Sequence, residues 1–314
     1  MSAPLKPIGI YYENEKWLLP LFAELKKQNI PFEKLFAPDH LFVPHHRESP
    51  YSLVINRMSP SAHKRNAGHT ILYTLQYLAY LKSIGANFLN GYETFVLESS
   101  KAYQANIFEE LDIKYPKTVV VNDIQNLVRA SEKLRFPVLT KSNIGGSGAG
   151  IQKFHSRDDL QKAVADKSLE VSVDNIILLQ EYLTPKGGTI VRVEVLNDEF
   201  LYAIKINVQG ESFNLCPAED CGTEGSACTI ARSIAAENYL PPLAVIETVK
   251  KIFQHTGIEI GGVEYLVNEE DGEIYYYDIN TLSNFVTNAT DVVGFDPWQN
   301  FVEYIVQKAE GGNF

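Results

Sequence analysis

A lysine and a run of glycines lie side by side in residues 137–154, PVLTKSNIGGSGAGIQKF. Lys141 ends a short apolar run, and four of the six residues from 145 to 150 are glycines. A chain without Cβ atoms brings its backbone N–H groups close to an anion, so such loops often hold phosphates. The flanking runs are short and lack helical periodicity, which predicts a strand, a loop and a second strand. We interpret this hairpin as a lid over phosphates, with a flexible surface hairpin as the alternative.

Three familiar nucleotide-binding patterns do not fit this sequence. A Walker loop reads G-x-x-x-x-G-K-[ST] and opens a helix, whereas here the lysine precedes the glycines. A dinucleotide fingerprint needs a third glycine where Ile151 stands. A protein kinase is excluded because the sequence contains neither an H-R-D catalytic loop nor a D-F-G motif.

A candidate metal site follows from strand periodicity, because residues two apart on a strand share a face. In the stretch EIYYYDIN this places Asp278 and Asn280 on one face and Tyr277 on the other. Glu264, in GGVEYLV, lies beside them if the two strands pair across the turn at residues 271–272. Two carboxylates and an amide oxygen suit Mg²⁺, a hard cation that takes few protein ligands. The alternative is that these are solvated strand residues.

Two cationic residues show the same alternation. Arg192 shares its predicted face with Glu194, while the neighbouring valines take the other face. Lys205 shares its face with Asn207, opposite apolar residues. A cation on a strand whose other face is apolar lies either at the solvent side of a sheet or in a cleft, and the pattern leaves both open.

Arg57 ends a predicted strand in the first part of the chain. Open α/β sheets bind ligands beyond the carboxyl ends of their strands. With Lys64 and Arg65 close in sequence, Arg57 is therefore a candidate for holding a substrate carboxylate. A solvated basic loop is the alternative.

The elements that must position these residues fall into three groups. About the first hundred residues alternate β-rich runs with helical patterns, the longest over 68–83, and predict a small parallel α/β domain. Helices over 101–111 and 123–134, with the glycine hairpin, predict an α+β unit. The remainder is rich in strands and contains one predicted helix over 242–255.

Composition narrows the class of protein. The chain has 314 residues, a formal charge of −11 and a pI of about 5.2, which argues against nucleic acid as a general partner. Cys216, Cys221 and Cys228 form neither a C-x-x-C zinc pair nor an even disulfide set, so we expect a reducing, cytoplasmic compartment. The sequence has no apolar run of 18 residues and no signal-peptide pattern, so no membrane partner is expected.

The order of these motifs closely resembles the ATP-grasp superfamily, in particular the RimK-type carboxylate-amine (glutamate) ligases, over roughly residues 95–300. The resemblance implies an α/β plus α+β fold. A Rossmann-like pre-ATP-grasp domain over 1–95 would precede an ATP-grasp fold of two α+β subdomains, 96–183 with the glycine-rich loop and 184–314 with the metal site.

The resemblance also implies roles for individual residues. The nucleotide would lie between the two subdomains. The lysines and the glycine loop would be at its phosphates, and the strand that links the subdomains, LLQEYL at residues 178–183, would lie along its adenine. The implied nucleotide-binding residues are Lys101, Lys141, Gly145, Gly146, Ser147, Gly148, Gln180, Glu181, Tyr182 and Leu183. The implied metal ligands are Glu264, Asp278 and Asn280, the catalytic residues are Arg192 and Lys205, and the substrate-binding residues are Arg57, Asn207 and Asn284.

The activity implied by the resemblance is the activation of a carboxylate by ATP to an acyl phosphate, which an amine then attacks to give an amide, ADP and phosphate. The expected cofactors are ATP and Mg²⁺, with Mn²⁺ as an alternative. The expected partners are small-molecule or peptide carboxylates and amines, glutamate or another amino acid among them, and a homo-oligomer is left open. The alternatives are an ATP-grasp phosphotransferase and a non-catalytic nucleotide-binding regulatory protein. Ile190 and Lys186 stand where the family commonly has acidic residues, which leaves the ribose contacts open.

Overall fold

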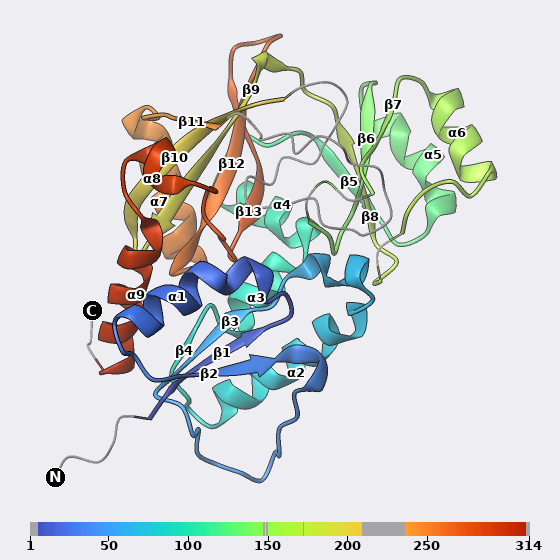
Figure 1. Ribbon diagram of the computed structural model, residues 1–314. Helices are drawn as coiled ribbons and strands as arrows, with labels where there is room; N and C mark the ends of the chain where they lie inside the picture. Colours follow the sequence, from blue (N-terminus) through green and yellow to red (C-terminus); the bar gives the residue numbers. More distant parts are fainter. Residues whose placement is uncertain (1–5, 147, 149, 172, 209–235, 312–314) are drawn as a thin grey trace, which may run out of the picture.

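The N-terminal part of the chain forms a parallel sheet covered by helices (Figure 1). The computed structural model describes residues 6–146, 148, 150–171, 173–208 and 236–311, and the three cysteines and Ser147 lie outside these ranges. The sheet has the order β2-β1-β3-β4, and all its pairs are parallel. Its elements are β1 (Ile8–Tyr12), η1 (Lys16–Leu18), α1 (Leu19–Lys27), β2 (Phe32–Phe36), η2 (Ala37–Asp39), β3 (Leu53–Arg57), η3 (Pro60–Arg65), α2 (Gly68–Ser83), β4 (Phe88–Leu89) and α3 (Tyr92–Glu98).

The second unit is an antiparallel sheet in the order β5-β8-β6-β7. Its strands β6 and β7 are the two arms of the glycine hairpin, so the predicted strand-loop-strand is confirmed. The elements are α4 (Lys101–Glu110), β5 (Thr118–Val121), η4 (Ile124–Asn126), α5 (Leu127–Ala130), η5 (Ser131–Lys133), β6 (Val138–Ser142), β7 (Gln152–Phe154), α6 (Arg157–Ala165) and β8 (Ile177–Glu181).

The third unit is a larger antiparallel sheet in the order β11-β10-β9-β12-β13. It contains two hairpins, β9 with β10 and β12 with β13, and the second is the pairing expected across the turn at residues 271–272. The elements are β9 (Pro185–Leu196), β10 (Glu199–Asn207), β11 (Ala236–Asn238), α7 (Leu243–Thr256), β12 (Ile260–Asn268), β13 (Ile274–Asn280), α8 (Ala289–Val293) and α9 (Pro297–Ala309).

Two expectations about helices differ from the structure. The single helix predicted over 123–134 is three short pieces, and the side chains of Asp123 and Ser131 bond to nearby backbone groups there. Such local bonds compete with the hydrogen bonds of a continuous helix. Helix α3 was not predicted, because seven residues after Gly91 are too few for a clear helical period.

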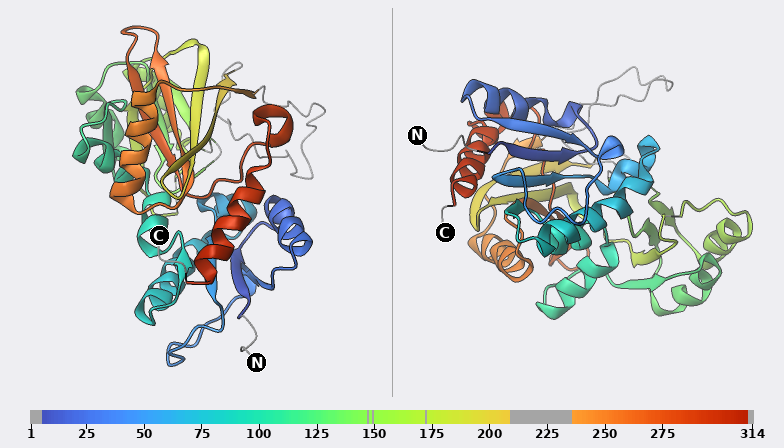
Figure 2. Two further views of the ribbon diagram at one scale, coloured as in Figure 1. Left: turned by 90° about the vertical axis from the view of Figure 1, so that its left-hand side faces the viewer. Right: turned by 90° about the horizontal axis from the view of Figure 1, so that it is seen from below.

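The hydrophobic core does not stop at the predicted domain boundary near residue 95. One cluster of buried side chains joins β1 and β3 of the first sheet to α9 and to β10 of the third sheet, through residues such as Ile10, Ile55, Ile204 and Phe301. Helix α9 packs against α1, and Figure 2 shows the C-terminal helix beside the N-terminal sheet in both views. The chain therefore returns at its end to cover the unit with which it began.

A close approach between β12 and β13 requires Gly261. A Cβ at this position would lie 2.2 Å from the backbone oxygen of Asn280, which cannot rotate away. We expect Gly261→Ala to lower the free energy of unfolding by about 1–3 kcal/mol, the usual cost of overpacking. Chemical denaturation measures this, with Gly145→Ala as the control because the nearest atoms to a Cβ there are 3.7 and 3.8 Å away. Equal denaturation midpoints for the two variants would contradict the close approach.

Candidate functional site

A cavity of about 740 Å³ lies where the three sheets meet. Its lining residues come from the carboxyl end of the N-terminal sheet, from the glycine hairpin and its neighbour β8, and from one face of the large sheet. Most of the residues predicted from the sequence line it. They are Arg57, Lys101, Lys141, Gly145, Gly146, Gly148, Gln180, Glu181, Tyr182, Leu183, Arg192, Glu264, Asp278, Asn280 and Asn284.

Strand register explains why the charged residues of the large sheet meet. Arg192 on β9 lies opposite Glu264 on β12, and Glu264 lies opposite Asp278 on β13. Directly opposed residues of antiparallel strands share a face, so these three side chains form a row across the sheet. The next row consists of Glu194, Gly262 and Asn280.

The expectation for Tyr277 is wrong. It was placed on the face opposite Asp278, but it lines the cavity beside Asp278 and Asn280. The cause is an irregularity in the pairing of β12 with β13, where Glu264 pairs with Asp278 but Tyr265 pairs with Tyr276. A β-bulge adds one residue to one strand and breaks the two-residue alternation.

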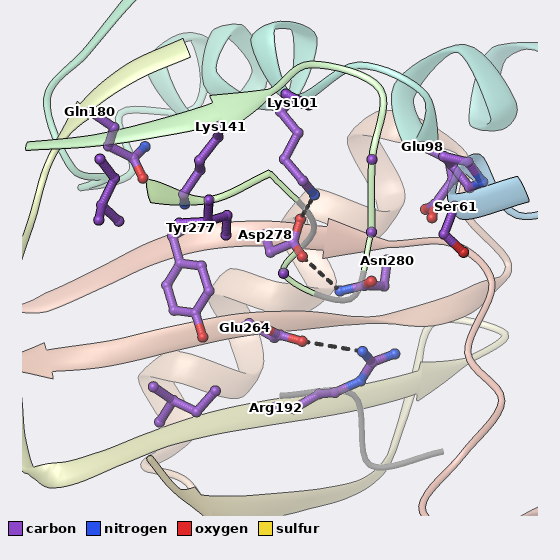
Figure 3. A pocket seen from close by; sticks show the side chains of 18 of the residues that line it. Ser61, Glu98, Lys101, Lys141, Gln180, Arg192, Glu264, Tyr277, Asp278 and Asn280 are labelled. Carbon is purple, nitrogen blue, oxygen red and sulfur yellow. Dashed lines mark hydrogen bonds and ion pairs between the residues drawn. The ribbon is translucent and has the colours of Figure 1, made fainter. Parts of the chain in front are cut away.

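The polar side chains of these two rows, which form one wall of the cavity, contact one another and Lys101 directly (Figure 3). The Lys101 ammonium donates a hydrogen bond to Oδ1 of Asp278, and Nδ2 of Asn280 donates to Oδ2 at 3.4 Å. Arg192 donates from Nη1 to Oε1 of Glu264 at 3.2 Å and from Nε to Oε1 of Glu194 at 2.6 Å. One guanidinium is thus shared by two carboxylates.

Local structure holds the two lysines in place. Lys101 is the first residue of α4, whose N-terminus is capped by the side chain of Ser100. Asn143, directly after β6, accepts hydrogen bonds from the N–H groups of Lys101 and Ala102. The end of β6 and the start of α4 are therefore joined, which brings Lys141 and Lys101 to the same part of the cavity.

Burial and neighbouring charges shift the pKa values of these groups. Burial lowers the pKa of Lys141 to about 8, and the charge of Lys101 also acts to lower it. Burial acts to lower the pKa of Lys101 too, but the carboxylates of Asp278, Glu98 and Glu264 together more than offset this, and the pKa is raised. Burial, followed by the charge of Asp278, raises the pKa of Glu264. The site therefore holds closely spaced charges in a poorly solvated place, which is typical of functional sites.

The donor set on β12 and β13 fits a divalent cation by its chemistry. Glu264 and Asp278 are directly opposed and Asn280 follows on the same face, so two carboxylates and an amide oxygen lie together. Among the described residues no group of three or more His, Cys, Asp or Glu side chains could hold a metal, and this set has only two such residues. Mg²⁺ takes few protein ligands and completes its octahedron with water and phosphate oxygens.

Strand β8 and the residues directly after it form the end of the cavity beside Lys141. Gln180 donates from Nε2 to the Thr118 hydroxyl at 2.8 Å. The Lys153 ammonium lies 3.5 Å from the centre of the Tyr182 ring. Figure 3 shows Gln180 and Lys141 on one side of the site and Ser61 and Glu98 on the other.

Several lining residues were missed by the sequence reasoning. Lys153 lies on the second arm of the hairpin, and Ser61 and Glu98 come from the N-terminal unit. Glu98 accepts a hydrogen bond from the backbone N–H of Thr281, 183 residues away. No local sequence pattern indicates that Glu98 or Ser61 lines the cavity. Lys153 could have been predicted, because it lies on the strand that directly follows the glycine loop.

Among the described residues that line the cavity, neither Lys205 nor Asn207 is present. Lys205 pairs in register with Val191, whose side chain packs in the cluster beneath α7, whereas Ile204 pairs with Arg192. The Lys205 ammonium lies over the Tyr239 ring at 4.4 Å and 3.9 Å from Glu237. The predicted catalytic role of Lys205 and the predicted substrate role of Asn207 stay predictions.

Most of this site lies in a part of the chain that matches a known protein family. Residues 100–297 match the family described as the carbamoyl-phosphate synthase L chain, ATP binding domain. This match covers more than half of the chain, which therefore belongs to that family and to the ATP-grasp superfamily, as the resemblance implied.

Relatives and solved structures agree with the superfamily. The chain is 27% identical over 203 residues to D-alanine–D-alanine ligase B of Clostridium tetani, a match that covers 62% of this chain and 51% of that protein. It thus spans about half the length of that relative. The RimK domain ATP-grasp protein of Sphaerobacter thermophilus has the same fold, with a TM-score of 0.64, 15% identity and coverage of 95% and 99%. The ATP-grasp ligase PsnB, solved with a variant of its minimal precursor, Mg and ADP, has a TM-score of 0.68, 14% identity and coverage of 98% and 100%.

No helix among the described residues combines the length and the apolar character required to cross a membrane.

The lowered pKa of Lys141 predicts how ATP affinity depends on pH. The ammonium is charged below about pH 8 and neutral above it, and the anionic phosphates bind the charged form better. Affinity should therefore fall as pH rises from 7 through 8 to 9.5, by up to about tenfold per unit above pH 8. Calorimetric titration with ATP tests this. The variant Lys141→Met should bind more weakly at pH 7 and show a flatter profile, and an identical slope in both proteins would contradict the assignment.

Proposed function

We propose that this chain is an ATP-dependent carboxylate-amine ligase that forms an amide or peptide bond through an acyl phosphate and releases ADP and phosphate. The observation that carries the proposal is a cavity in which two partly buried lysines face a wall of two carboxylates and an amide. The family match supports it, as do relatives named as ligases of D-alanine and of glutamate. The RimK-type assignment is part of the proposal.

Lys101 and Lys141 are proposed to bind the phosphates of ATP, with the glycine hairpin above them. The Lys101 ammonium donates a hydrogen bond to Asp278, so Lys101 lies beside the proposed metal ligands. The backbone N–H groups of Gly145, Gly146 and Gly148 would add donors without occupying space. Gln180, Glu181, Tyr182 and Leu183 are proposed to line the adenine site.

Glu264, Asp278 and Asn280 would hold Mg²⁺ when it is bound. There the ion would neutralise phosphate charge and orient the transferring phosphoryl group. The residues that contact these ligands have a separate effect: Lys101 and Arg192 neutralise the carboxylates and hold them toward the cavity. The wall is therefore ordered by its own ion pairs.

Arg192 is proposed to stabilise the negative charge that develops at the reacting carbonyl and phosphoryl oxygens. Its guanidinium is buried, lines the cavity, and is oriented by Glu194 and Glu264. A donor held in place before the reaction has no reorganisation cost when charge develops. We leave Lys205 and Asn207 outside this set, because their strand positions share the face that packs against α7.

The domain division 1–95, 96–183 and 184–314, the cytoplasmic location and the homo-oligomer stay predictions. Substrates are proposed by class only, as a carboxylate and an amine.

Turnover in a substrate screen tests the proposal. Pure protein with ATP, Mg²⁺ and pools of amino acids and short peptides should release ADP and phosphate together with a new amide, detected by mass spectrometry. Asp278→Asn keeps the shape of the side chain and should lose nearly all turnover while unfolding at the same temperature. Product containing a phosphorylated substrate and no amide would show a phosphotransferase instead.

The effect of Arg192→Lys separates chemistry from nucleotide capture. Lysine keeps the charge but cannot bond Glu194 and Glu264 through a planar fork. We expect kcat to fall by about a hundredfold to a thousandfold, the range for loss of one transition-state donor, with ATP affinity changed far less. Steady-state kinetics and ATP titration of the same variant measure both. A loss of affinity in proportion to the loss of rate would move Arg192 to nucleotide binding.

A further inference from the structure

Lys101 is bonded to Asp278, one of the proposed metal ligands. Its ammonium donates to Oδ1 of Asp278, and Nδ2 of Asn280 donates to Oδ2 of the same carboxylate at 3.4 Å. Figure 3 shows the Lys101 side chain extending from the helix above toward this carboxylate. Both oxygens of Asp278 are therefore in contact with donors of the protein itself.

The contact between Lys101 and Asp278 is open to the cavity. The two side chains are 18% and 20% exposed, and both residues line the cavity. The capped N-terminus of α4 fixes the backbone of Lys101, but its ammonium lies at the end of a flexible four-carbon chain. The ammonium can therefore exchange one anion for another while the helix stays in place.

Arg192, the other cation bonded to the wall, is held more firmly. The residue is 7% exposed, and its guanidinium is bonded to both Glu194 and Glu264. Moving it away would break ion pairs with two buried carboxylates at once, which is costly. Of the two cations that neutralise the proposed metal ligands, Lys101 is therefore the one that a ligand can replace.

The charges around the cavity balance without any ligand. Among the described residues, five lysine or arginine side chains and five acidic side chains line it: Arg57, Lys101, Lys141, Lys153 and Arg192, and Glu98, Glu181, Glu194, Glu264 and Asp278. A divalent cation alone would add excess positive charge to this poorly solvated place, and the phosphates of ATP alone would add excess negative charge. Bound together, the two charges largely cancel, so each ligand favours the other.

An ammonium displaced from Asp278 needs another anion. Burial acts to lower the pKa of Lys101, and the carboxylates that act to raise it are Asp278, then Glu98 and Glu264, so these are the acids close to it. Glu264 already accepts a hydrogen bond from Arg192, and Glu98 accepts one from a backbone N–H group. The phosphates of ATP would supply a free anion to receive the ammonium.

We propose that the Lys101 ammonium occupies Asp278 in place of the metal in the nucleotide-free protein and moves to a phosphate when ATP binds, so that a divalent cation binds the wall only together with the nucleotide. This rests on the proposed function and adds to it the coupling between the two ligands. By linkage, ATP raises the affinity for the metal by the same factor by which the metal raises the affinity for ATP.

Mn²⁺ binding to the nucleotide-free protein tests this exchange, with the loss of the electron paramagnetic resonance signal of free Mn²⁺ as the readout. We expect the wild type to bind weakly and Lys101→Met to bind one ion about tenfold more tightly, within the usual range of coupling between sites. The matched control is Lys141→Met. It removes the same charge from the same cavity, but the Lys141 ammonium lies 5.5 Å from the centre of the Tyr277 ring and is not bonded to Asp278. Equal affinities of the wild type and Lys101→Met, or an equal gain in both variants, overturn the proposal.

Two more variants locate the ion and separate charge from folding. Asp278→Asn combined with Lys101→Met should lose the gain, and a gain that survives means that the ion binds elsewhere, which overturns the proposal. Lys101→Arg keeps the charge and should bind Mn²⁺ as weakly as the wild type. If Lys101→Met fails to fold by circular dichroism, Lys101→Gln replaces it with the same expectation.

The dependence on ATP is measured by water-proton relaxation, which distinguishes Mn²⁺ held by a protein from Mn²⁺ bound to ATP in solution. We expect little enhancement with the wild type and Mn²⁺ alone and a large one when ATP is added, whereas full enhancement without ATP overturns the proposal. Amide formation by the wild type without a gain in Lys101→Met would leave the ligase function and remove the exchange. A gain in Lys101→Met without any turnover would support the exchange and remove the ligase function.

Discussion

Arg192 lies between two buried carboxylates, and the rest of the site depends on that arrangement. Glu194 and Glu264 could not both be buried and charged without a shared cation, because an unpaired charge in a poorly solvated place is costly. The pairing in turn requires that β9 and β12 keep their register and that Gly262 leaves space beside it. The same register places Asp278 on the next strand, where Lys101 neutralises it. The wall is therefore a set of carboxylates and cations, with Glu264 and Asp278 next to each other, held in place by backbone pairing.

The cavity depends equally on contacts between distant parts of the chain. Arg57 ends a strand of the N-terminal sheet, but its bonded partners are Ser283 and Asn284, in the loop that follows β13. The shared hydrophobic cluster and helix α9 hold these two parts together. One end of the site consequently forms only when the first and last units pack, whereas the two lysines are brought together by the contact between β6 and α4.

The family match covers most of the site but not its N-terminal end. Residues 100–297 include both lysines, the glycine hairpin and the carboxylate wall, but not Arg57 or Ser61. A shared fold does not define a substrate, because specificity depends on the particular side chains placed at the site. The N-terminal unit adds a buried cation and polar groups at the end of the cavity away from Gln180, and that is where relatives with different substrates are expected to differ.

The sequence by itself determined most of the elements and much of the lysine end of the site. Three features follow from local patterns: the helix over 68–83, the glycine hairpin, and the alternation that places Asp278 and Asn280 on one face of a strand. Such patterns depend only on the backbone geometry of residues that are neighbours in the chain. Only the tertiary structure decided which face of a strand looks into the cavity. Alternation showed that Lys205 and Ile204 point in opposite directions, but packing against α7 decided that Lys205 faces away. The bulge that turns Tyr277 inward and the contact of Glu98 with Thr281 likewise arise from strand register and long-range packing, which no window of neighbouring residues contains.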